Sequence, residues 1–545
     1  NQSGQSTSRF LAGPAWEYVN DTTNSIYRTR ALEYTERRLS ALQFNGEHYG
    51  MFGTGIRLSW LAGISTTRQD EPDLRYFADE RSVAMVEDPV TGDLVPSGDY
   101  RYVINRSRYQ IPSRLWRLID EDHHEYKADL DIPLGRTTKF KTGVAWLKKE
   151  RTHDERKFTY RRTQDYSSFN GDADAWAADV GVDTVIVLNE TTGRTQWRFD
   201  NYIGEEREPQ NSYNAEQKVF GTYGMFELPL TLKLSVVAGV RYETTKMTTV
   251  NSGSSIFIPD SSSQIDGGDF LPSLNIIYKL QSNMNARVAY GRTLARPTLR
   301  EMSHAFYDEF GGGLTFLGNP DITYTRIDNY DVRWEWFLRP GEILAISGFY
   351  KNFKDPIELT IVDVNGTIGP VNVPKARLYG VELEFRRGLD HVGRFLRYFK
   401  LGGNITLVHS EVDIPGGELT DLRLVDPNAK DTRPMVGQSP YVVNLDLAYE
   451  NPLSGTSLSL LYNVFGERMA FNAQDFTPDV FEQPFHSLDF IASQRVIWNV
   501  NLKFSVKNLL NSDHKFTQDY QGKEYITQLY NTGRSFSLGA TFIIE

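Results

Sequence analysis

The chain has 545 residues, with 59 Lys and Arg against 70 Asp and Glu, and a formal net charge of −11. The acidic balance argues against a general nucleic-acid binder, and the absence of Cys excludes disulfide scaffolds, Cys-ligated metal centres and thiol catalysis. No stretch approaches the roughly 18 consecutive apolar residues of a membrane-spanning helix. Aromatic residues make up 13% of the chain, which is too many for a disordered protein.

Short and long connections alternate along the chain. The short ones lie at Tyr49–Gly55, Pro133–Thr137, Pro229–Lys233, Leu280–Asn285, Arg339–Glu342 and Asn451–Gly455. Long polar ones, rich in Gly and Asp, lie at 70–112, 152–210, 251–268, 297–323, 358–373, 411–437, 470–482 and 511–533. This alternation is typical of outer-membrane barrels of bacteria, which have short periplasmic turns and long extracellular loops.

Between the connections, apolar and polar residues alternate with a period of two. Clear examples are Asn329–Trp336, Tyr441–Tyr449, Trp498–Val506 and the final segment from Ser535 to Ile544. This pattern predicts strands with one apolar and one polar face. Many of these runs reach about ten residues, the length that crosses a bilayer at a tilt.

The sequence therefore predicts an all-β fold, a large antiparallel transmembrane β-barrel that occupies residues 1–545. We count about 17 strands, whereas closed single-chain barrels of bacteria have an even number. We therefore expect that the first strands are missing from this chain, or that some are hidden in 1–30 or in a long loop. The alternative of a soluble all-β binding protein or glycan-active enzyme stays open, and independence from detergent would favour it.

A set of motifs in the second half resembles the TonB-dependent outer-membrane receptors. The longest is the strand Leu271-Pro-Ser-Leu-Asn275, a tight turn, and a strand that ends in Arg292-Thr-Leu-Ala-Arg296-Pro297. The further similarities follow in family order at Gly318-Asn319-Pro320-Asp321, Asn329-Tyr330-Asp331, Phe349-Tyr350-Lys351, Asp355-Pro356-Ile357, Tyr379-Gly380-Val381-Glu382, Lys507-Asn508-Leu509-Leu510-Asn511 and Gly533-Arg534-Ser535-Phe536. The resemblance covers residues 270–545, and residues 30–250 fit by their hairpin rhythm alone.

The resemblance implies a receptor and transporter in the outer membrane of a Gram-negative-type bacterium. Such a protein binds a scarce solute outside the cell, for example a siderophore, vitamin, oligosaccharide or peptide. It imports this solute with energy relayed by TonB, ExbB and ExbD through an N-terminal plug domain, which is not recognisable in this chain. The whole receptor would have about 22 strands. No enzymatic activity and no cofactor are expected, and the surroundings would be the lipid bilayer and lipopolysaccharide.

A second hypothesis is a structural barrel without transport of its own. It would serve as a docking site for surface lipoproteins or secreted proteins, and its plug would be absent or supplied by another chain. A plug and TonB segment encoded upstream in the gene would favour transport instead.

Charged residues on the polar faces of the strands are predicted to face the lumen, where they would meet water or a plug. These residues are Arg287, Asp331, Arg333, Glu335, Lys351 and Lys503. We expect them mainly to solvate the lumen and hold a plug, with a direct role in solute passage as the alternative.

Aromatic residues in the long loops are candidates for ligand binding, because loops carry specificity on a rigid scaffold. They are Trp176, Phe306, Tyr307, Phe310 and Phe316. The alternative is that they only pack within their loops. One dense group of potential metal ligands, Glu121–Glu125, contains His123 and His124, but neighbouring residues on a strand point to opposite faces. We therefore expect no metal site there.

Overall fold

The computed structural model describes residues 2–14, 23–51, 55–104, 112–162, 169–178, 184–189, 191–199, 201–206, 209–253, 262–307, 315–362, 367–425, 427–472, 478–497, 500–520 and 522–542. In this part of the chain, most residues lie in antiparallel strands, and 21 strands form one sheet. No helix among the described residues is both long enough and apolar enough to cross a membrane.

Eighteen strands of the large sheet follow one another as an antiparallel meander, each paired with its neighbour in this series. They are β1 (Gln2–Pro14), β2 (Thr23–Met51), β3 (Ile56–Glu87), β5 (Ser113–Pro133), β6 (Lys139–Arg162), β10 (Tyr213–Pro229), β11 (Leu234–Asn251), β12 (Ser262–Gln281), β13 (Met284–Ala295), β16 (Thr325–Arg339), β17 (Glu342–Lys354), β20 (Lys375–Gly388), β21 (Phe399–Asp413), β23 (Tyr441–Asn451), β24 (Thr456–Phe465), β27 (Phe485–Ile497), β28 (Val500–Lys507) and β31 (Ser535–Phe542).

The remaining elements lie in the long connections, except for η3 (Arg394–Leu396), which lies in the shorter connection between β20 and β21. Three short strands extend the large sheet: β4 (Leu94–Val103), β9 (Asn201–Glu206) and β22 (Thr432–Arg433). Smaller sheets contain β7 (Thr184–Asn189) and β8 (Arg194–Phe199); β14 (Phe306–Tyr307), β15 (Phe316–Leu317), β18 (Ile357–Ile361) and β19 (Ile368–Asn372); and β25 (Arg468–Phe471), β26 (Val480–Glu482), β29 (Asp513–Tyr520) and β30 (Lys523–Asn531). The helices are α1 (Ala173–Ala178), α2 (Leu299–Met302), α3 (Gly416–Val425), η2 (Pro209–Asn211) and η3 (Arg394–Leu396).

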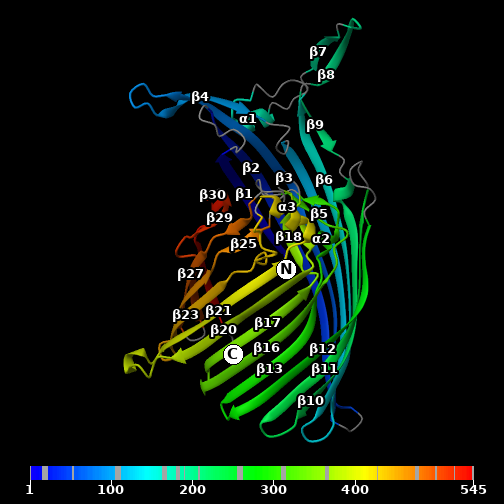
Figure 1. Cartoon of the computed structure of the whole chain (residues 1–545), viewed down its shortest axis with the longest axis vertical. Helices are drawn as coiled ribbons and strands as arrows, with labels where there is room; N and C mark the ends of the chain where they lie inside the picture. Colours follow the sequence, from blue (N-terminus) through cyan, green and yellow to red (C-terminus); the bar gives the residue numbers. More distant parts are fainter. Residues whose placement is uncertain are drawn as a thin grey trace.

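The sheet curls into a barrel with tilted strands, as Figure 1 shows. The short turns and η3 lie at its lower end, and the long loops, the other short helices and the small sheets lie at the upper end. The predicted barrel fold and the alternation of short and long connections are therefore confirmed. Among the described residues, no pairing joins β1 to β31.

The predicted long loops contain strands, and the wall strands β3 and β6 extend furthest into them. β3 runs on to Glu87 and pairs with β4, and β6 runs on to Arg162 and pairs with β9. These extensions rise beyond the level of the bilayer, where neither face needs to be apolar, so the alternation that marks a membrane strand is lost. Trp498 and Ile544, which we expected in the last strands, lie outside the described residues.

Directly paired residues on neighbouring strands point to the same side of the sheet, so the register shows which residues share a face. From β13 through β16 and β17 to β20, the paired set Ala289, Asp331, Phe349 and Gly380 lies on the inner face. The set displaced by one residue, Val288, Val332, Gly348 and Val381, lies on the outer face. Three of these outer side chains are valines that are at least half exposed.

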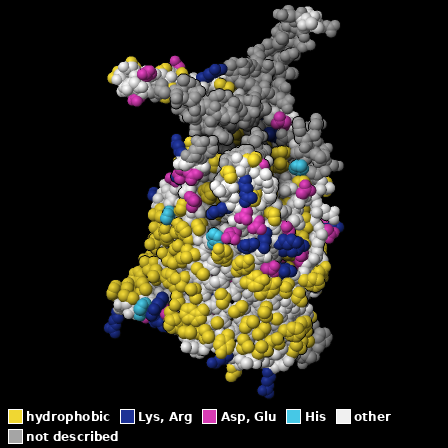
Figure 2. Space-filling view, viewed as in Figure 1, with side chains coloured by type: hydrophobic (Ala, Val, Ile, Leu, Met, Phe, Trp, Pro, Cys, Tyr) yellow, Lys and Arg dark blue, Asp and Glu magenta, His cyan; other side chains and the backbone are white. Residues whose placement is uncertain are grey.

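On the face that Figure 2 shows, hydrophobic side chains gather in a band across the lower half of the barrel, and charged side chains concentrate above it and at the lower rim. Where the band ends, four tyrosines lie side by side in direct register: Tyr290, Tyr330, Tyr350 and Tyr379. A ring of amphipathic aromatic residues on the outer face marks the interface of a transmembrane barrel. We call this row the tyrosine girdle.

Candidate functional site

The inner wall at the level of the hydrophobic band carries a connected group of charges. Glu335 is only 5% exposed. Its carboxylate accepts a hydrogen bond from Arg287 at 2.7 Å and a longer one from Arg333 at 3.3 Å. Arg333 also donates to Glu384 at 2.7 Å, so the group spans β13, β16 and β20. Paired charges can line a lumen without leaving an isolated buried ion.

The other three predicted lumen residues share this face but not this group. Asp331 lies two residues from Arg333 on β16, Lys351 lies on β17, and Lys503 lies on β28. Within the described part of the chain, no ion pair or hydrogen bond joins their side chains to another residue. The structure thus places all six predicted residues on one face and brings three of them together.

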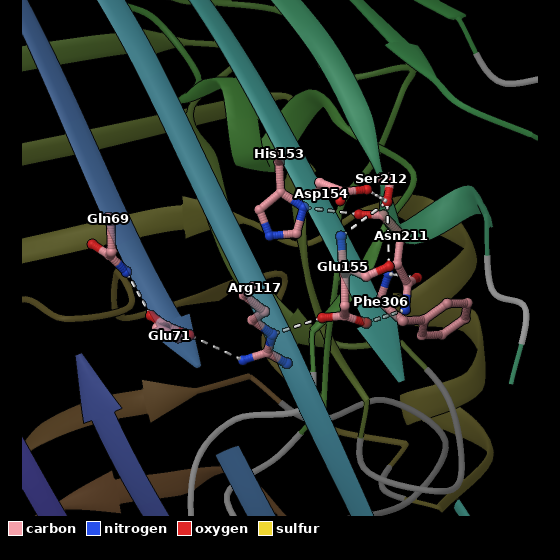
Figure 3. A network of polar contacts seen from close by, with 9 residues as sticks. All are labelled: Gln69, Glu71, Arg117, His153, Asp154, Glu155, Asn211, Ser212 and Phe306. Carbon is pink, nitrogen blue, oxygen red and sulfur yellow. Dashed lines mark hydrogen bonds and ion pairs between the residues drawn. The ribbon is translucent and has the colours of Figure 1, made fainter. Parts of the chain in front are cut away.

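A second polar network lies where the wall meets the loops, and Figure 3 shows its side chains. Arg117 on β5 reaches Glu155 on β6 at 2.6 Å and Glu71 on β3 at 3.8 Å. Gln69 donates to Glu71 at 2.5 Å. The side chains of Arg117, Glu71 and Glu155 are mostly buried, with 13%, 12% and 3% of their surface exposed. Burial raises the pKa of Glu71, and the nearby Arg117 lowers it by less.

Asn211 joins this network to a loop. Its Nδ2 donates to Glu155 at 2.8 Å, and its Oδ1 accepts from the backbone N–H of Phe306 at 3.0 Å. The Nδ1 of His153 lies 2.9 Å from the carbonyl oxygen of Asn211. The network therefore connects the wall strands β3, β5 and β6 to the segment before β10 and to Phe306 in the loop after β13.

His153 lies outside the bilayer, although β6 spans it. The outward-facing residues just below it, Lys148 and Glu150, form an ion pair at 2.8 Å, which marks the level above the lipid. The imidazole is 2% exposed and stacks on Tyr213 at 5.2 Å. Burial lowers the pKa of His153 to about 4, so the ring is neutral at pH 7.

The described parts of the loop after β13, residues 296–307 and 315–324, cover this network with an apolar cluster. Helix α2 begins with a capping box, in which Thr298 and Glu301 exchange hydrogen bonds with backbone N–H groups. Leu299, Met302, Tyr307 and Phe316 are buried in one cluster with residues of β10, β11 and β12, and partly buried Phe471 packs against it. The guanidinium of Arg300 lies 4.4 Å from the Tyr307 ring and 4.2 Å from the Phe316 ring.

The five predicted loop aromatics therefore have different surroundings. Tyr307 and Phe316 are buried in the cluster just described, and Phe306 is half-buried beside it. Trp176 is buried in a separate cluster with Ile104 and Phe169. Phe310 lies outside the described residues. In this structure the described aromatics pack within and between loops, and their role in ligand binding stays a prediction.

Sequence reasoning missed the network around His153. Its members come from β3, β5, β6 and the segment before β10, so no local spacing connects them. Arg117 and Glu155 occupy inward positions of long strands, and that alternation was the only available signal. The register pairs His123 with Lys149 and His124 with Lys148, on opposite faces of the sheet. Among the described residues, no group of three or more His, Asp and Glu side chains could hold a metal ion.

Comparison with known proteins points to one family. The family model described as "TonB dependent receptor-like, beta-barrel" matches residues 2–509. A search of curated protein sequences gave no match.

Several solved structures are similar to this chain over 99% of its length. They include the ferric yersiniabactin uptake receptor FyuA from Yersinia pestis (12% identity, 78% of that chain, TM-score 0.52). The siderophore receptor PiuA from Acinetobacter baumannii is 13% identical over 78% of its chain, with a TM-score of 0.53. The ferric citrate transporter FecA is 10% identical over 76% of its chain, with a TM-score of 0.51. At these identities the likeness supports the fold.

Proposed function

Because the chain belongs to the family of TonB-dependent receptor-like β-barrels, we propose that it is the barrel of an outer-membrane receptor that imports a scarce solute. The match of the family model over residues 2–509 carries this proposal. The geometry is compatible with it, because a barrel of this size with a charged inner wall encloses a polar lumen. Energy relayed by TonB, ExbB and ExbD would act on a plug domain seated in that lumen.

Ferric siderophores are the first solutes to test. FyuA and PiuA, which this chain resembles in fold, are described as a ferric yersiniabactin uptake receptor and a siderophore receptor. The charged inner wall supports passage of a polar, charged complex better than passage of an apolar one. Vitamins, oligosaccharides and peptides form the rest of the panel.

Uptake in the bacterium that encodes the chain tests the proposal. Cells with and without the gene would receive each solute of the panel in radioactive form, with the siderophores as complexes of radioactive iron, and a strain without TonB would serve as the energy control. We expect at least one solute of the panel whose uptake falls to background both without the gene and without TonB. Unchanged uptake of the whole panel would contradict the proposal. Recovery of a surface lipoprotein with the barrel would then favour the docking barrel.

A further inference from the structure

The outer surface directly above the tyrosine girdle carries a first row of balanced charges. Arg292 on β13 pairs with Asp328 on β16 at 2.9 Å. Arg377 on β20 lies 3.9 Å from Glu411 on β21. The register places Asn352 between the two pairs. In this row each cation has an anion beside it, so the row needs no further partner.

The second row, two residues higher, is different. The register aligns Arg326, Lys354 and Lys375 on the three neighbouring strands β16, β17 and β20. Arg326 is bound to Asp269 at 2.6 Å. Lys354 and Lys375 are directly opposite each other, and neither makes an ion pair or side-chain hydrogen bond with any described residue. Like charges directly opposite on a sheet are destabilising, so this pair costs stability unless an anion lies between the two ammonium groups.

The height of this pair matches the headgroups of a bilayer. Tyr350 and Lys354 are four residues apart on one strand, which is about 13 Å along the strand and less in height because the strands tilt. Lys side chains are long and bring their charge toward the interface. Below the girdle, the same two strands expose Ile346 and Val381, each about half, on the same face. An amphipathic ligand at this place can therefore contact the cations with its polar end and the apolar side chains with its apolar end.

We propose that Lys354 and Lys375 bind the phosphate of a membrane lipid headgroup. A phosphate supplies the negative charge that the two lysines lack, and its oxygens accept their N–H donors. The apolar strip below the girdle contacts the acyl chains. The site is on the outer wall and away from the lumen, so it is independent of solute import.

Lipid retention by the purified chain tests this site. The full chain, folded in detergent, is incubated with lipid A that carries both phosphates, and retained lipid is measured by native mass spectrometry. The double variant Lys354→Gln/Lys375→Gln should retain about tenfold less of it, because each lysine near a charged headgroup contributes separately. The variant Lys354→Arg/Lys375→Arg should retain lipid as the parent chain does. The matched control is Lys233→Gln/Lys279→Gln, which removes two exposed lysines at the short-turn end and should change nothing.

Two further arms identify the chemistry. Lipid A without phosphates should bind the parent chain about as weakly as phosphorylated lipid A binds the Lys354→Gln/Lys375→Gln variant. Inorganic phosphate at millimolar concentration should not displace the phosphorylated lipid, and displacement would assign the pair to a soluble anion instead. Undiminished retention by the Lys354→Gln/Lys375→Gln variant, or an equal loss in the control, would overturn the proposal. Heat-dependent migration in electrophoresis verifies that each variant is folded.

Discussion

His153 is almost completely buried and lies between the barrel wall and the loops. Its Nδ1 faces the carbonyl oxygen of Asn211, and its ring lies between Tyr213 and Tyr307, each 5.2 Å away. The charged groups nearby are Glu155, which favours the protonated ring, and Arg117 and Arg151, which oppose it. Burial dominates, so protonation of this ring works against the contact between β6 and the loop cluster.

The folded loop cluster should loosen as the pH falls from 6.5 toward 4. The pKa of His153 is about 4 in the fold against an ordinary value of 6.5. Above pH 6.5 both states are neutral and the stabilisation is complete. Below pH 6.5 the opened segment takes up a proton that the folded one does not, which costs about 3 kcal/mol at most. Hydrogen exchange of residues 299–307, corrected for its intrinsic pH dependence, measures this opening.

The variant His153→Phe provides the control for this pH dependence. It keeps an aromatic ring between the two tyrosines but cannot titrate, so its loop should lack the acid-induced opening that His153 causes. Glu71 acts in the opposite direction, because burial raises its pKa and its contribution therefore grows as the pH falls. Both chains contain Glu71, so the difference between them isolates the histidine. The same acid-induced opening in both chains would contradict this assignment.

At the scale of the strand, the register agrees with the predicted alternation, and exposure of the charged face to the lumen stays a prediction. Asn329–Trp336 was expected to carry aromatic and apolar residues on one face and Asp331, Arg333 and Glu335 on the other, and β16 does so in register with both neighbours. The extensions of β3 and β6 were not predictable in the same way. The outward-facing residues of these extensions lie above the bilayer and need not be apolar. The alternating pattern that marks a membrane strand is therefore absent there.

Replacing Val332 with Arg should destabilise the barrel by about 1–3 kcal/mol, because this side chain lies on the lipid face of the apolar band, between the tyrosine girdle and the bilayer midplane. Val332 is 56% exposed on that face, between Tyr330 and Trp334. The matched change is Ala289→Arg, on the inner face directly opposite Asp331. It should cost much less, because the new cation meets water and a carboxylate. Urea unfolding in lipid vesicles compares the two, and equal costs would reverse the assignment of the faces.

At the scale of the whole molecule, the sequence predicted the barrel and its two unlike ends, but not how the loops pack together. The loop cluster joins residues of β10, β11, β12, α2, β14, β15 and β18. A buried ion pair between Arg433 and Glu358, at 2.7 Å, joins β18 to β22 in a further loop. Such contacts link segments far apart in sequence. Taken alone, the sequence of each loop shows only turn-forming and polar residues, which do not reveal the segments it packs against. The tyrosine girdle, by contrast, follows from strand registers that short turns determine.

The two ends of the barrel should lie on opposite sides of the outer membrane, and single cysteines can test this because the chain has none of its own. Val90, at the tip of the β3–β4 hairpin, is 90% exposed, and Leu232, in the short turn between β10 and β11, is 97% exposed. In intact cells, a membrane-impermeant maleimide should label Val90→Cys and leave Leu232→Cys unlabelled. After the outer membrane is permeabilised, both should react. Ala345→Cys, at a fully buried position, should stay unlabelled throughout and thus report any unfolded protein. Labelling of Leu232→Cys before that of Val90→Cys would mean that the barrel has the opposite orientation, with its long loops toward the cell interior.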